Sequence, residues 1–171
     1  MTMTYTDTVR DELLAAAKQA LDAVNRDMEL LAPQTALPPE HLFEFEGSKI
    51  RVRPIYGRTL VFEWGPRRYN ETTPGLDADP FVANGVEYPR LTVDFNADGE
   101  IIRTSTYFGR SLTDSAKKKL REYAPRVREA WLAEGYLAAW HAACRANDEH
   151  WKLSKERTAI ENLIEAMEGS S

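Results

Sequence analysis

Apolar residues near the N-terminus recur at helical spacing. They stand three or four positions apart and form one seam: Leu14, Ala17, Leu21, Val24, Met28 and Leu31. This spacing predicts a helix over residues 1–32, which Thr8 and Asp11 can cap at its start and Pro33 ends. Such a seam suits packing on a sheet. The same seam, over residues 9–31, also suits a homodimeric coiled coil.

Alternation of apolar and polar residues then predicts antiparallel strands between residues 42 and 108. In the stretch LFEFEGSKIRVRP, Gly47-Ser48 suits a two-residue hairpin turn with glycine first. The strands that flank this turn would share one apolar face. On the other face the register predicts two opposite-charge pairs, Glu46 with Lys49 and Glu44 with Arg51.

One connection within this region is unusually long. Residues 65–88 contain three prolines and three glycines, and they form a small hairpin at Asn84-Gly85 in this interpretation. Irregular connections of this length are uncommon in compact domains and are often functional. The sequence therefore indicates a docking loop at one edge of the sheet.

The stretch DFNADGEI, residues 94–101, has two interpretations. Its acidic and amide side chains and Gly99 match the first half of a calcium loop. The last position of such a loop requires a bidentate glutamate, and here it is Ser105 between alternating strands rather than helices. A hairpin turn explains the residues without metal. It would place Val93 against Ile102, with Ile102 and Thr104 facing inward.

Helical patterns return after residue 111. Ser111 with Asp114 can cap a first helix, Pro125 is expected to start a second, and a break at residues 154–158 precedes a third. The predicted fold is therefore α+β: an N-terminal helix, a four- to five-stranded antiparallel sheet, and three C-terminal helices packed on one sheet face. It forms a single domain over residues 1–171, with the helix at 1–32, the sheet at 42–108 and the helices at 111–168.

Composition excludes several classes of protein. The chain has 171 residues, a formal net charge of −5 and one cysteine, Cys144. No internal disulfide can form, and no apolar stretch is long enough to span a membrane. The N-terminal residues do not resemble a secretory signal. We expect a cytoplasmic protein.

Catalytic and metal chemistry have little support in the sequence. It contains no phosphate-binding glycine loop, nucleophile elbow or His-Glu-x-x-His motif. His141, Cys144 and Asp148 share one side of a predicted helix at ligand-like spacing, but Cys144 lies within an apolar stripe, so a structural role is favoured. We therefore predict no cofactor, no bound metal and no enzymatic activity. A metal-dependent enzyme around His141 is the third hypothesis.

Charge is segregated along the chain. Residues 47–68 carry six basic and one acidic side chain, and residues 102–128 carry eight and two. The basic blocks at 49–68 and 117–128 make nucleic-acid binding the alternative hypothesis. No recognised nucleic-acid motif supports it, and the sequence pI is about 5.3.

Protein binding is the favoured function. Arginine and large aromatic residues anchor protein interfaces, and they cluster in or near the long connection. The predicted partner-binding residues are Arg58, Trp64, Arg67, Arg68, Tyr69, Tyr107 and Arg110. We expect an adaptor or an inhibitor with a protein partner, for example a phage-type counter-defence inhibitor of a nucleic-acid-handling complex.

Overall fold

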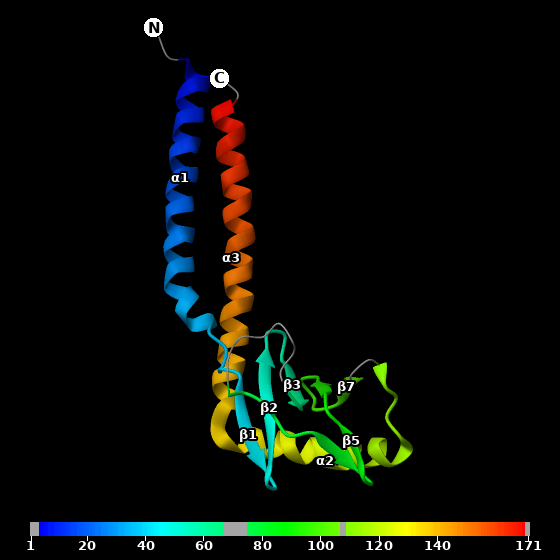
Figure 1. Cartoon of the computed structure of the whole chain (residues 1–171). Coiled ribbons are helices and arrows are strands. Elements are labelled where there is room, and N and C mark those ends of the chain that lie inside the picture. The colour runs from blue at the N-terminus through cyan, green and yellow to red at the C-terminus, as the bar shows by residue number, and fades with distance from the viewer. Residues whose placement is uncertain (1–3, 67–74, 107–108, 170–171) are drawn as a thin grey trace. The chain divides into compact units, whose positions relative to one another are not determined.

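A computed structural model describes residues 4–66, 75–106 and 109–169 of the chain. It has an N-terminal helix, a five-stranded antiparallel sheet and a long C-terminal helical run, which confirms the α+β prediction (Figure 1). The chain divides into two compact units. The hairpin unit joins the chain up to Ala36 with the chain from Ala142 onward, and the sheet unit is Leu37–His141. Single-domain organisation stays a prediction.

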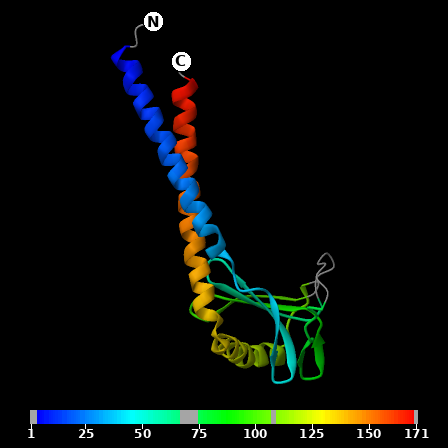
Figure 2. The ribbon, with the colours of Figure 1, turned by 90° about the vertical axis from the view of Figure 1, so that its left-hand side faces the viewer.

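The hairpin unit consists of two antiparallel helices. Helix α1 (Tyr5–Leu31) lies beside α3 (Leu137–Gly169) from Ala142 onward (Figures 1 and 2). The Thr4 side chain caps α1 by accepting a hydrogen bond from the Asp7 backbone N–H, and Asp7 accepts in return from Thr4. The helix thus starts earlier than the predicted Thr8–Asp11 cap, because Thr4 and Asp7 supply the same capping pair.

The seam of α1 packs against α3. Ala17, Val24 and Met28 are its buried members, and Lys18 Nζ lies 2.9 Å from Glu168 Oε1. The expectation that this seam packs on the sheet is therefore wrong. A homodimer through the same seam stays a prediction, and it would have to displace α3. A short 3-10 helix, η1 (Ala32–Thr35), follows α1.

The sheet unit contains the five-stranded sheet in the order β1-β2-β3-β6-β7. Each neighbouring pair is antiparallel. The strands are β1 (His41–Phe45), β2 (Ser48–Ile55), β3 (Thr59–Trp64), β6 (Leu91–Phe95) and β7 (Ile101–Thr106). A separate two-stranded hairpin, β4 (Phe81–Ala83) with β5 (Val86–Tyr88), confirms the predicted turn at Asn84-Gly85.

The β1–β2 turn differs from its prediction. Glu46 and Gly47 both have positive φ, 50° and 80°, so they are the two central residues of the turn. Two-residue hairpin turns of this type place glycine second. The cross-strand pairing therefore shifts by two residues. Each side chain stays on its predicted face of the sheet, but the pairs change: Glu44 faces Lys49, and Arg51 faces Leu42. The predicted pairs Glu46–Lys49 and Glu44–Arg51 are wrong.

The DFNADGEI stretch is a hairpin turn, as predicted. The Asn96 side-chain oxygen accepts hydrogen bonds from the backbone N–H groups of Asp98 and Glu100, and Gly99 has a φ of 84°. An irregularity at Asp94/Phe95 then alters the expected register, so Val93 faces Thr104 rather than Ile102. Ile102 is 54% exposed, and the prediction that it faces inward is wrong.

The C-terminal region is one long bent helical run rather than three helices. Helix α2 (Asp114–Trp131) is capped by Thr113 instead of Ser111, and Pro125 lies inside it. The bend occurs within η3 (Leu132–Tyr136) at Gly135, whose φ of 95° is not helical. Helix α3 then continues to Gly169 with no break at residues 154–158.

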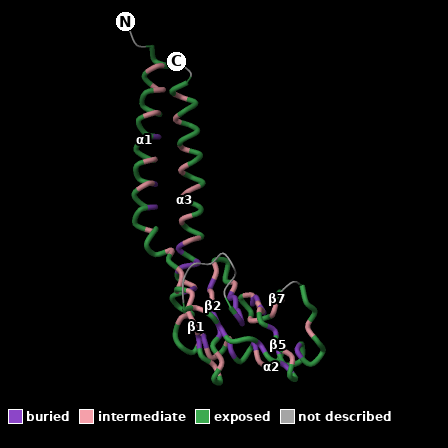
Figure 3. Tube along the Cα trace, viewed as in Figure 1, coloured by how far each residue is buried: buried purple, intermediate pink, exposed green. Residues whose placement is uncertain are grey.

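Helix α2 covers one face of the sheet (Figure 2). Alternate residues of the strands face it and form the core with α2, and Figure 3 shows buried residues concentrated in this unit. The prediction that all C-terminal helices pack on the sheet is corrected, because the chain from Ala142 packs with α1 instead. The largest side chains that are less than 2% exposed are Trp131, Trp140, Tyr88, Phe62, Phe95, Ile50, Leu60 and Leu91.

Candidate functional site

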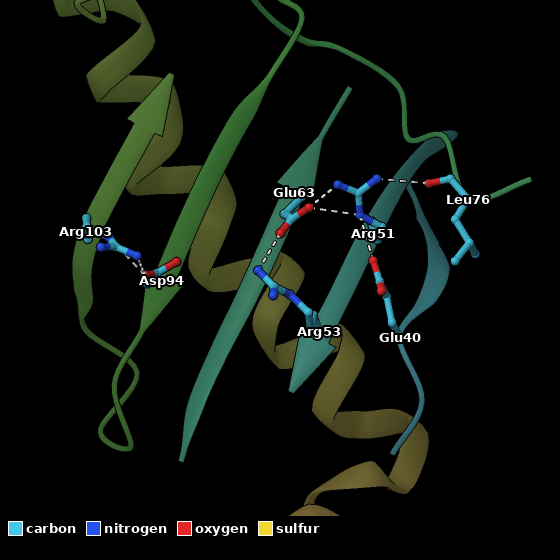
Figure 4. Close-up of polar contacts among 7 residues, drawn as sticks. All are labelled: Glu40, Arg51, Arg53, Glu63, Leu76, Asp94 and Arg103. Carbon is cyan, nitrogen blue, oxygen red and sulfur yellow. Dashed lines mark hydrogen bonds and ion pairs between the residues drawn. The ribbon is translucent and has the colours of Figure 1, made fainter. Parts of the chain in front are cut away.

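The sheet face opposite α2 carries a buried ion-pair cluster (Figure 4). Arg51 is only 2% exposed and Glu63 only 5%. Arg51 Nε donates to Glu63 Oε2 over 2.9 Å, and Arg53 Nη2 donates to Glu63 Oε1 over 2.8 Å. Glu40 Oε1 lies 2.9 Å from Arg51 Nε, and the Leu76 carbonyl accepts from Arg51 Nη1. Both oxygens of Glu63 are therefore engaged by neighbouring guanidinium groups.

This cluster has the geometry of a structural ladder. Glu63 lies directly across from Arg51 on adjacent strands, where opposite charges stabilise a sheet. A second cross-strand ion pair repeats the arrangement on β6 and β7, where Arg103 Nη2 lies 2.9 Å from Asp94 Oδ2. With its carboxylates held by arginines, the cluster offers no free acid or base to a substrate.

Only part of the predicted partner-binding set lies in the described residues. Arg67, Arg68, Tyr69 and Tyr107 lie outside them. Trp64 is described and is 2% exposed, with its ring against Phe62 and Phe81, so it belongs to the core rather than the surface.

Of the predicted partner-binding arginines that the structure describes, Arg58 lies far from the start of the long connection and Arg110 lies near its end. Arg58 is exposed in the turn before β3, whereas Trp64 ends that strand. The six residues of β3 separate these positions by about 20 Å of strand. Arg58 is therefore far from the connection with which sequence proximity had grouped it. Arg110 lies nearer, with its guanidinium carbon 5.4 Å from the Tyr88 ring centroid.

The described parts of the long connection are anchored to the sheet unit. Asp79 bonds to Lys49 twice: its backbone N–H donates to the Lys49 carbonyl, and its carboxylate accepts from the Lys49 N–H, both over 2.8 Å. Gly65 exchanges backbone hydrogen bonds with Ala78 and Asp79. Farther along, Phe81 and Tyr88 are buried in the core. The aromatic residues of these segments thus serve packing.

Tyr88 links the end of the long connection to the start of α2. Its hydroxyl accepts a hydrogen bond from the Thr113 backbone N–H over 3.0 Å. Hydrogen bonding with the Thr113 side chain and backbone lowers the pKa of Tyr88 below its usual value. On α2 itself, burial and the Glu46 carboxylate raise the pKa of Tyr123. Both tyrosines are tied into the fold by defined contacts.

A polar cleft lies beside the end of β7. We name it the β7 cleft, and its volume is about 380 Å³. Hydroxyl groups and two exposed cations, Arg110 and Lys117, dominate its lining. Among the described residues, its lining consists of Thr104, Ser105, Thr106, Gly109, Arg110, Ser111, Leu112 and Lys117. The cleft suits an anionic group, because it combines hydroxyl donors with positive charge.

Strand β7 is an edge strand of the described sheet. The sheet order ends at β7, and within the described ranges no strand pairs on its outer side. Ile102 to Ser105 are all exposed. A strand at a sheet edge presents unpaired backbone N–H and C=O groups, which can template another extended chain. The edge and the β7 cleft share Thr104, Ser105 and Thr106, so they form one continuous surface.

Many basic residues of the two blocks have partners within the fold. Arg51 and Arg53 bind Glu63, and Arg126 binds Glu46. Lys119 donates to the Val82 carbonyl and lies over the Phe81 ring, 5.3 Å from its centroid. The prediction of a basic surface for nucleic acid therefore relies on a smaller exposed set, which includes Lys117, Lys118 and Arg121 on α2.

Within the part of the chain that the structure describes, no group of three or more His, Cys, Asp or Glu residues could hold a metal ion. On α3, Cys144 is buried at 3% exposure, and Asp148 is exposed. No helix among the described residues combines the length and apolar character needed to cross a membrane.

No protein-family model, curated protein or solved structure matches this chain.

Proposed function

We propose that this chain is a non-catalytic protein-binding protein, an adaptor or an inhibitor. The observation that carries the proposal is the outer edge of β7, with which no described strand pairs and which continues into the cationic β7 cleft. An extended segment of a partner can add to such an edge as a further strand, with backbone hydrogen bonds giving affinity and side-chain contacts giving specificity.

The charges beside this edge indicate the chemistry of the segment. Arg103 is well exposed on β7, and Arg110 and Lys117 line the β7 cleft. Carboxylates of an added strand would meet these three cations. The favoured partner therefore presents an extended acidic segment, and attraction between opposite charges would speed its association.

The first test uses two single proline variants, Thr104→Pro and Ser105→Pro. In an antiparallel strand, successive N–H groups face opposite sides, so one proline removes an outward donor and the other an inward donor. The variant that keeps the wild-type circular dichroism spectrum has lost the outward donor. That variant should lose capture of acidic peptides from a displayed library of unstructured peptides, which wild-type protein should enrich.

The second test reverses charge in the β7 cleft. Arg110→Glu with Lys117→Glu should weaken peptide binding roughly tenfold or more, about the loss of one charge-assisted contact. Lys118→Glu is the matched control, because Lys118 is exposed on α2 and does not line the cleft. Enrichment of basic peptides, or equal binding by all variants, would contradict the proposal.

Nucleic-acid binding by the exposed lysines and arginine of α2 is the alternative. It predicts retention on DNA or RNA at low salt, with affinity that falls steeply as salt increases. In that case Lys118→Glu with Arg121→Glu would weaken retention, while the proline variants of β7 would not.

A further inference from the structure

Helix α1 carries a second apolar stripe beside the seam that α3 covers. Each of its members stands one position before a seam residue, as Leu13 stands before Leu14. Leu13 is 58% exposed and Leu30 is 72% exposed. Of the positions directly before the seam residues, only the one that Asp27 occupies is charged. The exposed apolar members are Leu13, Ala16, Ala20, Ala23 and Leu30.

Helix α3 has a matching stripe near its end. Ala159, Leu163 and Ala166 each stand one position before Ile160, Ile164 and Met167, which face α1 at intermediate exposure. Leu163 is 53% exposed. Earlier in α3, the corresponding positions are occupied by the charged residues Lys152 and Glu156. The apolar stripe on α3 is therefore confined to its last turns.

The Lys18–Glu168 ion pair shows that the two stripes face the same way. Lys18 stands one position after the seam residue Ala17, and Glu168 stands one position after Met167. Their contact at 2.9 Å places the positions after the seam together on one side of the hairpin. One residue turns a helix by about 100°. Positions before the seam on both helices therefore meet on the other side.

We infer that this shared side, which we name the outer apolar face, is where a second copy of the chain docks. A two-helix layer buries little by itself: from Asn147 to Gly169, no described residue of α3 is buried. Two such layers stacked face to face form a four-helix bundle, in which each stripe gains a partner. Alanine at three stripe positions of α1 and two of α3 allows the helices to approach closely.

The size of the face fits this occupant. At about 1.5 Å per residue and about 10 Å per helix width, residues 9–30 and 159–169 present roughly 500 Å² in each copy. Two copies bury roughly 1,000 Å², the lower bound for a specific interface. The face is nearly uncharged and is the same in both copies, so two-fold pairing brings few like charges together. The dimer should therefore be specific but dependent on concentration.

The test compares self-association of matched variants by analytical ultracentrifugation across a concentration series. Ala20→Glu places a carboxylate at the centre of the outer apolar face. Ala15→Glu makes the same change on the opposite side of the same helix, at a position that is also exposed. Wild type and Ala15→Glu should dimerise alike, and Ala20→Glu should dimerise at least roughly tenfold more weakly.

Circular dichroism shows whether each variant keeps its helices. If Ala20→Glu loses helix, Leu163→Glu on α3 provides the second measurement, because Leu163 is exposed. A wild-type protein that stays monomeric throughout the series would overturn the inference, and so would a dimer that Ala20→Glu and Leu163→Glu leave intact. In the first outcome, the face serves a different partner.

Discussion

At the scale of single residues, Gly65 is the glycine with the least room for a side chain. Its φ is +95°, and a Cβ built at this position would stand 1.3 Å from the Pro89 carbonyl oxygen. Relief of that overlap would disturb the hydrogen bonds that tie Gly65 to Ala78 and Asp79. The position thus combines a backbone conformation that favours glycine with the close approach of a second backbone.

We expect Gly65→Ala to lower the free energy of unfolding of the sheet unit by more than about 4 kcal/mol, a loss found where several mechanisms combine. Gly57→Ala is the matched control, since Gly57 has a φ of +83° and open space around it. It should cost only the conformational strain of about 1–2 kcal/mol. Urea denaturation would measure both, and equal losses would show that the Pro89 contact is unimportant.

The buried Glu63 should also be sensitive to substitution. Glu63→Ala leaves buried Arg51 with Glu40 as its remaining carboxylate partner, and we expect a loss of about 3 kcal/mol, the lower end for a broken buried ion pair. Arg51→Met with Glu63→Leu should recover part of that loss, because it leaves no charge buried between the strands, although the more exposed Glu40 and Arg53 lose their contacts. Arg126→Ala removes an exposed ion pair and should cost less than about 1 kcal/mol. A double variant as unstable as Glu63→Ala would contradict this account.

The sequence pattern predicted some of these features and not others. Alternation along β2 and β3 predicted which face is apolar, because that pattern has a period of two. It could not show that Arg51 is buried, since burial of a charged side chain depends on Glu40 and Leu76, which approach from other segments. The close approach of Pro89 to Gly65 is likewise a tertiary contact without a local signal.

At the scale of elements, turn chemistry decided where prediction succeeded. Asn84-Gly85 has glycine second, as the favoured hairpin turn requires, and its prediction is confirmed. The Gly47-Ser48 assignment placed glycine first and gave the wrong partners, although the faces were right. Pro125 also misled, because it lies inside α2 rather than at a boundary. A proline restricts helices, but tertiary packing can retain it.

Gly135 marks the true bend in the C-terminal helical run. An added Cβ would meet no atom within 4 Å, so only its φ of +95° opposes substitution. We expect Gly135→Ala to destabilise the protein by about 1–2 kcal/mol, and Gly135→Asn by less, because asparagine tolerates this conformation better. Thermal unfolding followed by circular dichroism would show this order. Equal stability of all three proteins would mean that the bend does not depend on glycine.

The edge position of β7 illustrates a feature that sequence can suggest only in part. The run IIRTST reads as a strand, and it is the last strand before the helices begin. Position at the end of the series is compatible with an edge, but sheet order requires the pairing itself. Lys117 and Arg110 meet at the β7 cleft only in the fold, so Lys117 was predicted in the basic block 117–128 but not among the partner-binding residues.

At the scale of the whole molecule, the two units differ in how well they bury aromatic residues. Trp64, Trp131 and Trp140 lie in the sheet unit and are at most 2% exposed, whereas Trp151 in the hairpin unit is 62% exposed. Trp140 also donates its ring N–H to the Ile55 carbonyl over 3.0 Å. Intrinsic fluorescence therefore contains buried and solvated components from different units.

We expect Trp151→Phe to shift the emission maximum to shorter wavelength and to reduce quenching by acrylamide, because it removes the solvated component. Trp140→Phe should have the opposite effect on both quantities, since it removes a buried component. Steady-state emission spectra of the folded proteins measure this directly. An unchanged spectrum for Trp151→Phe would mean that Trp151 is covered in solution.

The single cysteine makes the local opening of α3 measurable. Cys144 is buried on α3, and it is the one thiol in the sequence, so a thiol reagent can modify the protein only once. Modification must wait until the helix around Cys144 opens, and at high reagent concentration its rate becomes the rate of opening itself. The kinetics of that one reaction would therefore time the transient openings of α3 in the unmodified wild-type protein.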